Sequence, residues 1–350
     1  MSLTKTGYHE RIIDDQISKQ LEIFGAICIE GPKWCGKTWT ALNHANSVSF
    51  IGSPEKNFQN RTMAQLSPGL VLEGSSPRLL DEWQEVPALW DAVRFAVDES
   101  RDKGRFILTG SSTPTHKGIL HSGTGRISKI RMRPMSLFES GDSTGQVSLT
   151  ELFSGNIREA KSEETSIHQV INLAIRGGWP DSIGMPSKSF SELPKAYLKS
   201  IVEEDIRRID NTNRNQRKFA MLLHSLARNE STLAGNTTLM KDILEETGED
   251  LNPNTVTEYL DVLRRLFILD EQPAFSPNLR SSVRIGKSAK KRFVDPSLAI
   301  AALGAGAERL LSDLHTFGFL FESMCIRDLR IYSEAIGAKL YHYRDETGRE

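Results

Sequence analysis

The stretch Gly31-Pro32-Lys33-Trp34-Cys35-Gly36-Lys37-Thr38 fits the pattern G-x-x-x-x-G-K-[ST] of a phosphate-binding loop. It follows the apolar run 24–29, which is typical of a buried strand, and it precedes residues 38–45, which lack Gly and Pro and favour a helix. A loop between a strand and a helix N-terminus points backbone N–H groups at a phosphate chain. The sequence therefore predicts a nucleoside triphosphate site.

Two side chains of the loop have specific expected roles. Lys37 would reach the β- and γ-phosphates, and the Thr38 hydroxyl would ligate Mg²⁺. The other expected nucleotide contacts are the rest of the loop and the first helical turn: Gly31, Pro32, Lys33, Trp34, Cys35, Gly36 and Trp39. The alternative is a chance match to the pattern, which the strand and helix on either side argue against.

A second motif, Arg78-Leu79-Leu80-Asp81-Glu82-Trp83-Gln84, is a short apolar strand that ends in two carboxylates, like a Walker B strand. After a phosphate loop, such a strand end would supply Asp81 to Mg²⁺ and Glu82 as the general base that activates water. The alternative is that both acids merely cap the helix expected over 86–93. We favour the catalytic interpretation.

Two further residues are candidates for sensing the phosphates. A third strand, 105–108, runs into Thr109-Gly110-Ser111-Ser112, and Ser111 is the preferred γ-phosphate sensor because it leaves the glycine turn first. Ordinary turn chemistry is the alternative. Arg126, at the end of the glycine-bearing loop 121–126, is a candidate arginine finger or charge sensor, and a solvated basic loop is its alternative.

These motifs predict an α/β fold, a P-loop NTPase parallel sheet with helices on both faces and the nucleotide at the carboxyl ends of the strands. We expect this ATPase domain to span residues 1–150. No N-K-x-D-like guanine reader is present, which favours ATP over GTP.

Taken together, the motifs resemble a family of prokaryotic AAA-type ATPases with a C-terminal domain of unknown function. The resemblance lies in the order of GPKWCGKT (31–38), LLDEWQEVPALW (79–90), FILTGSS (106–112) and Gly125-Arg126 before PMSLFE (134–139). Lys33 stands where the family usually has Arg, which keeps the charge. The resemblance implies an ATP hydrolase that uses ATP and Mg²⁺.

Residues 151–212 are expected to form a mostly helical lid. The resemblance extends to its turn Gly177-Gly178-Trp179-Pro180. Comparison with related ATPases makes Trp179 and Pro180 candidate adenine or lid contacts and Arg176 a candidate phosphate sensor. A helix–helix turn packed by Trp179 is the alternative.

Residues 213–296 have the pattern of a winged-helix-like module. Apolar spacing predicts helices near 219–226 and 240–246, and Asn252-Pro253 begins a third helix. The strands expected over 268–272 and 291–295 would pair as the wing.

Two roles stay open for this module. One is DNA contact through the basic stretch from Arg280 to Arg292, which would grip phosphates without reading sequence. The other is a structural or protein-docking role, since Glu258 and Asp261 on the third helix would repel phosphates.

The last part, 297–350, resembles the start of a restriction-endonuclease-like α/β domain, with a helix over 319–322 and a strand over 339–344. It stops within the pattern, so we expect a partial, truncated end. Glu322 and Glu350 alone do not form the carboxylate and lysine set of a metal nuclease, so nuclease activity is rejected.

Composition excludes little. A net charge of -1 gives no global attraction to nucleic acid or anionic membranes, and the three cysteines indicate neither disulfides nor zinc. No signal peptide or membrane-spanning run is found, so we expect a cytoplasmic protein without a membrane partner.

The main hypothesis is ATP hydrolysis coupled to movement of the C-terminal modules. A nucleotide-gated DNA- or protein-binding switch with little hydrolysis is the alternative, and a small-molecule phosphotransferase is a third. If Arg126 acts on the nucleotide of a neighbouring copy, the protein is a homo-oligomer; whether it acts within its own chain stays open.

Overall fold

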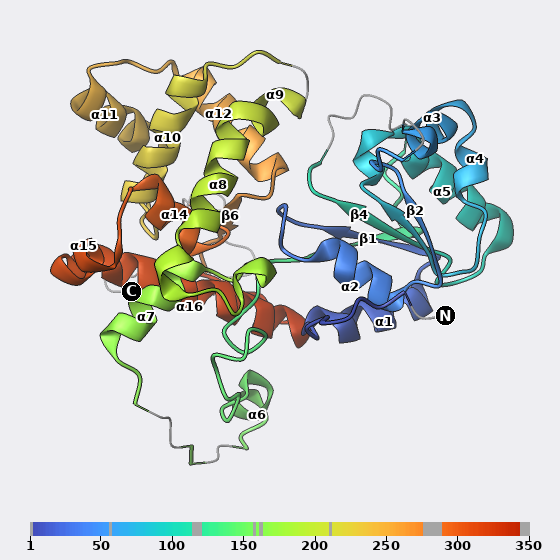
Figure 1. Ribbon diagram of the computed structural model, residues 1–350, viewed down its shortest axis with the longest axis horizontal. Coiled ribbons are helices and arrows are strands. Elements are labelled where there is room, and N and C mark those ends of the chain that lie inside the picture. Colours follow the sequence, from blue (N-terminus) through green and yellow to red (C-terminus); the bar gives the residue numbers. More distant parts are fainter. Residues whose placement is uncertain are drawn as a thin grey trace. The chain divides into compact units, whose positions relative to one another are not determined.

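The computed structural model describes residues 3–55, 58–113, 121–156, 159–160, 164–209, 212–275 and 289–343 (Figure 1). The chain divides into two compact units. Unit 1 contains Met1–Pro134 and Arg265–Phe267, and unit 2 contains Met135–Arg264 and Ile268–Glu350. Residues 135–150, which we expect in the ATPase domain, therefore belong to the second unit.

Unit 1 is built around a five-stranded parallel sheet, as predicted. The strands in spatial order are β2 (Ser47–Phe50), β3 (Arg78–Asp81), β4 (Phe106–Gly110), β1 (Ala26–Glu30) and β5 (Ile127–Arg131). The register pairs Asp81 with Thr109, and Thr109 with Ile29. The ends of β1, β3 and β4 therefore meet at one place, which we name the carboxyl edge of the sheet.

Helices cover both faces of this sheet (Figure 1). One face packs with α3 (Gln59–Leu66), α4 (Pro68–Val71) and α5 (Ala88–Ser100) in a core that contains Cys28, Leu80 and Leu108. The other elements of unit 1 are the short 3-10 helix η1 (Trp83–Glu85), α1 (Ile13–Ile23) and α2 (Lys37–His44). The helix α2 packs against β1, β3 and β4. The central strands β1 and β4 are mostly apolar because both of their faces are buried.

A three-residue segment returns to unit 1 from far along the chain. Arg265 and Thr113 exchange two hydrogen bonds, from Thr113 N–H to the Arg265 carbonyl at 2.9 Å and from Arg265 Nε to the Thr113 carbonyl at 3.1 Å. The guanidinium of Arg131 lies 4.2 Å from the centre of the buried Phe267 ring. We name Arg265–Phe267 the return segment.

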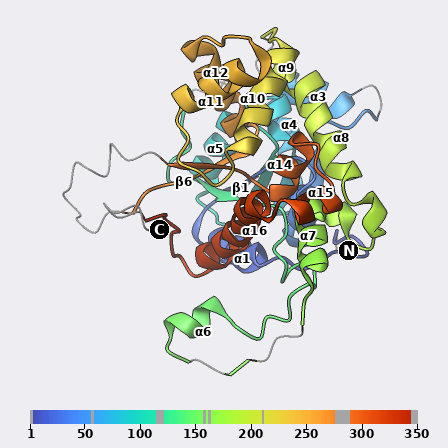
Figure 2. The same ribbon diagram turned by 90° about the vertical axis from the view of Figure 1, so that its left-hand side faces the viewer.

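Unit 2 is mostly helical. In chain order it contains α6 (Leu149–Phe153), α7 (Ile167–Arg176), η2 (Pro180–Ser182), η3 (Ser187–Ser189), α8 (Glu192–Ser200), the π-helical turn Ile201–Asp205, α9 (Ile206–Arg208), α10 (Gln216–Arg228), α11 (Asn236–Thr247), α12 (Pro253–Arg265, whose last residue is in unit 1), β6 (Leu269–Gln272), β7 (Lys290–Phe293), α14 (Pro296–Ala302), α15 (Ala307–Ser312) and α16 (Leu314–Ala335). In both views α6, which has no buried residue, lies apart from the other helices of this unit (Figures 1 and 2).

The short helix α14 joins the parts of unit 2 that we expect to be separate. It is buried over Pro296 to Ile300 and packs against α7, α8, α10 and α16. The predicted lid, winged-helix-like module and C-terminal end thus share one core through this helix.

The helices predicted for residues 213–265 are present as α10, α11 and α12. Asn252 Oδ1 accepts the N–H of Asn254 at 2.8 Å at the start of α12, and β6 pairs antiparallel with β7. That these elements form a winged helix stays a prediction. The strand expected over 339–344 is wrong for its described residues 339–343, which make only an isolated bridge between Ala274 and His342.

Candidate functional site

The loop 31–38 leaves β1 at the carboxyl edge and enters α2 at Lys37. A Cβ at Gly31 would lie 2.2 Å from the carbonyl oxygen of Met132, so only glycine fits there. Gly36 precedes α2 with φ 100°, a left-handed conformation that glycine adopts without a steric penalty. The sequence therefore folds this loop as a tight turn at a helix N-terminus, as the motif predicts.

A buried arginine supports the loop from the N-terminal segment. Arg11 donates from Nη1 to the carbonyl of Cys35 and from Nη2 to the carbonyl of Arg133, each at 2.8 Å. Cys35 itself is fully buried. Sequence analysis missed Arg11 because no motif surrounds it.

The Lys37 ammonium is buried and donates to the carbonyl of Pro32 at 2.7 Å. An ammonium carries three N–H donors, so two remain for an anionic ligand. The Trp34 and Trp39 side chains are each 44% exposed, and Lys33 is partly exposed. These three residues lie where the nucleotide was expected, but no contact in the structure tests their role.

Asp81 lies directly opposite Thr38. Its Oδ1 accepts from Thr38 Oγ1 at 2.8 Å and from Thr109 Oγ1 at 2.7 Å. Burial raises the pKa of Asp81, the hydrogen bonds from Thr109 and Thr38 lower it in part, and the nearby Glu82 charge adds to the rise. A buried carboxylate whose charge is this costly would gain from a cation beside it.

The donors at this point fit Mg²⁺, which prefers hydroxyl, carboxylate and phosphate oxygens. Thr38 gives its hydrogen to Asp81, so the lone pairs of its oxygen are left for a cation. The described part of the chain contains no group of three or more His, Cys, Asp or Glu that could hold a metal. A cation here would need phosphate oxygens as further ligands.

Glu82 turns away from Asp81. Its backbone is left-handed (φ 59°, ψ 48°), and its N–H donates to Thr109 Oγ1 at 3.1 Å. Its Oε2 accepts from Ser111 Oγ at 2.9 Å and from Gln84 Nε2. Such backbone strain in a non-glycine residue is typical of functional sites.

The structure thus brings together Lys37, Thr38, Asp81, Glu82 and Ser111 in one unit. It also adds Thr109 and Gln84, which sequence analysis quoted within motifs without giving them a role. The signal for Thr109 is the strand register, because Asp81 pairs with Thr109 across β3 and β4.

Arg126 is not brought to this group. It precedes β5, its carbonyl accepts from the N–H of Ala26 at the start of β1, and it therefore lies at the amino edge of the parallel sheet. A five-residue strand, about 16 Å, separates that edge from the loop 31–38. Arg126 Nε pairs instead with Asp98 at 2.7 Å. A role at the nucleotide of its own chain is incompatible with this position, because the loop 121–126 enters a strand rather than leaving one.

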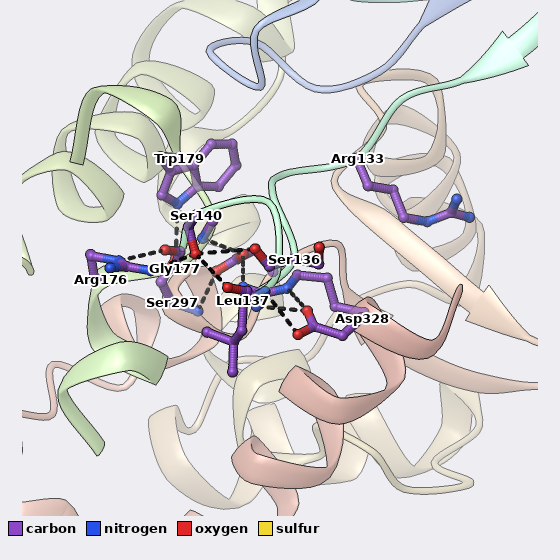
Figure 3. A network of polar contacts seen from close by, with 12 residues as sticks. Arg133, Ser136, Leu137, Ser140, Arg176, Gly177, Trp179, Ser297 and Asp328 are labelled. Carbon is purple, nitrogen blue, oxygen red and sulfur yellow. Dashed lines mark hydrogen bonds and ion pairs between the residues drawn. The ribbon is translucent and has the colours of Figure 1, made fainter. Parts of the chain in front are cut away.

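The turn 177–180 of unit 2 has a packing role. Trp179 is fully buried, donates from Nε1 to Ser297 Oγ at 2.9 Å and meets Tyr197 edge-on. Arg176 pairs with Asp142 (Figure 3). Neither side chain is exposed to a ligand, so the structure supports the packed turn and not the adenine, lid or phosphate contacts.

The same turn joins a buried polar network of unit 2. A Cβ at Gly178 would lie 2.0 Å from the Met135 carbonyl, and the Gly178 N–H donates to Asp295 Oδ2 at 2.9 Å. Asp295 in turn pairs with the buried Arg327 at 2.8 Å. The Leu137 N–H donates to Asp328 at 3.0 Å (Figure 3). Residues 134–139 and 177–180 are adjacent because both form hydrogen bonds to this network, the first through Leu137 and the second through Gly178.

The basic stretch from Arg280 to Arg292 is only partly described. Arg280, Arg284 and Lys287 lie outside the described residues. Lys290 and Arg292 are buried in β7 and pair with Glu322 at 3.3 and 2.6 Å. Because these two side chains are buried in ion pairs, they are not available to DNA phosphates. DNA contact through the other basic residues of the stretch stays a prediction.

Comparison with known proteins agrees with this geometry. Residues 24–140 match the family described as AAA domain. Residues 167–309 match a domain of unknown function. The two matches lie mainly in unit 1 and unit 2, respectively. The five-stranded parallel sheet of unit 1, with helices on both faces, is the fold of P-loop NTPases.

Uncharacterized proteins of Mycobacterium tuberculosis and Mycobacterium bovis are each 23% identical to the chain over 329 residues. The match covers 93% of this chain and 66% of each relative, so the chain spans slightly less than two thirds of their length. A solved Walker-type ATPase of Pyrococcus abyssi is similar in fold, with a TM-score of 0.53, 12% identity and coverage of 86% of this chain and 97% of that one. In the described residues, no helix combines the length and apolar character that a membrane span needs.

Proposed function

We propose that this chain hydrolyses ATP with Mg²⁺. The observation that supports the proposal is the continuous set of hydrogen bonds from Thr38 through Asp81 and Thr109 to Glu82 and Ser111. It joins the helix after the loop to the ends of β3 and β4, with the Thr109 hydroxyl between the Asp81 carboxylate and the Glu82 N–H. Mg²⁺, when bound by Thr38 and Asp81, would neutralise phosphate charge and orient the triphosphate.

The chain's own residues would divide the chemistry as follows. The N–H groups of the loop 31–38 and the free donors of Lys37 bind the β- and γ-phosphates. Glu82 takes a proton from a water molecule while the oxygen of that water forms a bond to the γ-phosphorus. The bond between the γ-phosphorus and the oxygen that bridges it to the β-phosphate breaks, which gives ADP and phosphate. Ser111 gives its hydrogen to Glu82 Oε2 and so holds the base at the end of β4, where we expect the γ-phosphate.

The return segment supports the second half of the proposal, that nucleotide state reaches the C-terminal part. Thr113 follows the sensor position Ser111 by two residues and holds Arg265 by two hydrogen bonds. Arg265 is the last residue of α12, and β6 begins just after Phe267. A shift at the end of β4 would therefore move the chain between α12 and β6.

ATP turnover by three variants tests the first half. Glu82→Gln should bind ATP and lose turnover by about 10²–10⁴-fold, the usual worth of a general base. Lys37→Ala should lose ATP binding. Glu85→Gln is the matched control, since its carboxylate faces Arg61 at 3.5 Å and not Ser111. Full turnover by Glu82→Gln would remove Glu82 as the base.

A nucleotide-gated switch with little intrinsic hydrolysis is the second candidate, and the position of Arg126 favours it. A single chain offers Lys37 but not Arg126 to the phosphates. If a neighbouring copy supplies Arg126, turnover per chain should rise with protein concentration, and Arg126→Ala should abolish that rise. Adding duplex DNA to the same assay tests whether DNA is a partner.

A further inference from the structure

The Glu82 carboxylate is held on one oxygen only. Oε2 accepts from Ser111 and from Gln84, whereas Oε1 has no hydrogen-bond partner in the part of the chain that the structure describes. A carboxylate fixed through one oxygen presents the other in a set direction. The group that fixes it therefore decides where a proton can be taken.

Gln84 contacts both of the other side chains, Glu82 and Ser111. Its Nε2 reaches Glu82 Oε2 and also lies 3.2 Å from Ser111 Oγ, so one carboxamide spans the ends of β3 and β4. Ser111 accepts from Gln84 and passes its own hydrogen to Glu82. Gln84 Nε2, Ser111 Oγ and Glu82 Oε2 are therefore each hydrogen-bonded to the other two.

The surroundings hold Gln84 in this position. It lies in the 3-10 helix η1 (Trp83–Glu85), next to Trp83, which is buried and stacks on Trp90 with ring centres 4.9 Å apart. A Cβ at Gly110 would come within 3.2 Å of Gln84 Oε1 and 3.0 Å of Trp83 Nε1. Glycine at 110 thus leaves room for the carboxamide to lie across β4.

We propose that Gln84 is the positioning residue of the active site, which aims Glu82 Oε1 at the attacking water through its hydrogen bonds to Glu82 and Ser111. This inference rests on the proposed ATP hydrolysis. A carboxamide suits the role because it donates without adding charge, so it orients the base and leaves it able to accept a proton. The spacing D-E-x-Q then has a reason, since η1 turns residue 84 back over residue 82.

The test is a double-mutant cycle on turnover in the full chain. Gln84→Ala should lower kcat by about 10–100-fold, the usual cost of a misplaced reacting group, and leave the affinity for a non-hydrolysable ATP analogue within about twofold. Combined with Glu82→Gln, it should add no further loss, because Gln84 acts only through Glu82. Gln65→Ala, an exposed glutamine of α3, is the matched control.

The outcomes separate the two proposals. If Glu82→Gln retains full turnover, the proposed function fails. If Glu82→Gln is inactive but Gln84→Ala is as fast as wild type, or if the two losses multiply in the double variant, the role of Gln84 is overturned. Loss of analogue binding or of thermal stability in Gln84→Ala would assign it a structural role instead.

Discussion

Replacing Glu230 by glutamine should change how the stability of unit 2 depends on pH. Glu230 follows α10, is buried, accepts the Phe293 N–H at 3.1 Å and accepts from Ser323 Oγ at 2.5 Å. It therefore joins α10, β7 and α16. Burial raises the pKa of Glu230 to about 7; the bonds from Ser323 and Phe293 and the Arg292 charge offset part of the rise, and Asp295 adds to it.

The size of the effect follows from this pKa. A difference between 4.5 and about 7 corresponds to about 3 kcal/mol, at about 1.4 kcal/mol per pH unit. Between these values the folded chain holds the proton and the unfolded chain has released it. The free energy of unfolding of the wild type should therefore fall as pH rises through this window.

Glu230→Gln is uncharged at every pH and keeps an oxygen for the Phe293 N–H. Its free energy of unfolding, relative to wild type, should grow by about 3 kcal/mol between pH 4.5 and 7.5. Denaturant unfolding followed by circular dichroism at several pH values measures this difference. Glu204→Gln, at an exposed position of the same unit, should show no such trend. A difference that stays constant with pH would refute a buried, proton-holding Glu230.

Three further predictions follow from single contacts. Thr109→Val removes the hydroxyl that donates to the Asp81 carboxylate and accepts from the Glu82 N–H. The free energy of unfolding, measured by thermal unfolding, should fall by about 1–3 kcal/mol, and ATP turnover should slow. Thr62→Val, on the exposed side of α3, should change neither. In Arg11→Lys, the single ammonium cannot bind the carbonyls of both Cys35 and Arg133 as the guanidinium does. The affinity for ATP, measured by titration, should fall about tenfold with little change in kcat. Unchanged affinity would show that Arg11 does not support the loop. Gly178→Ala forces a methyl group against Met135 and should destabilise unit 2 by about 2 kcal/mol or more, whereas Gly235→Ala, with open space around it, should be tolerated.

The sequence predicts the loop 31–38 and the strand end at Asp81 because their chemistry depends on neighbours within a few residues. A glycine loop before a helix can bind phosphate only in one local arrangement, and the structure has that strand, loop and helix. The position of Ser111 just after the glycine turn of β4 is also local, and its role as a γ-phosphate sensor stays a prediction. The spacing of motifs along the chain also indicates parallel strands.

Contacts between distant strands were not predictable in the same way. Only the register of β3 with β4 places the Thr109 hydroxyl between the Asp81 carboxylate and the Glu82 N–H. Only the direction of β5 places Arg126 at the far edge. Trp179 is a candidate ligand contact in sequence because its turn resembles a lid turn that touches the nucleotide in related ATPases. Its Ser297 partner is 118 residues further on, and tertiary packing decides its burial.

The return segment has a consequence for biosynthesis. Unit 1 begins at the N-terminus, yet its last three residues, Arg265–Phe267, are translated only after most of unit 2. Until the ribosome has passed Phe267, Thr113 lacks both of its hydrogen bonds to Arg265, and Arg131 lacks the aromatic ring beside it. Unit 1 of the nascent chain should thus reach its final form late, at nearly the same time as unit 2.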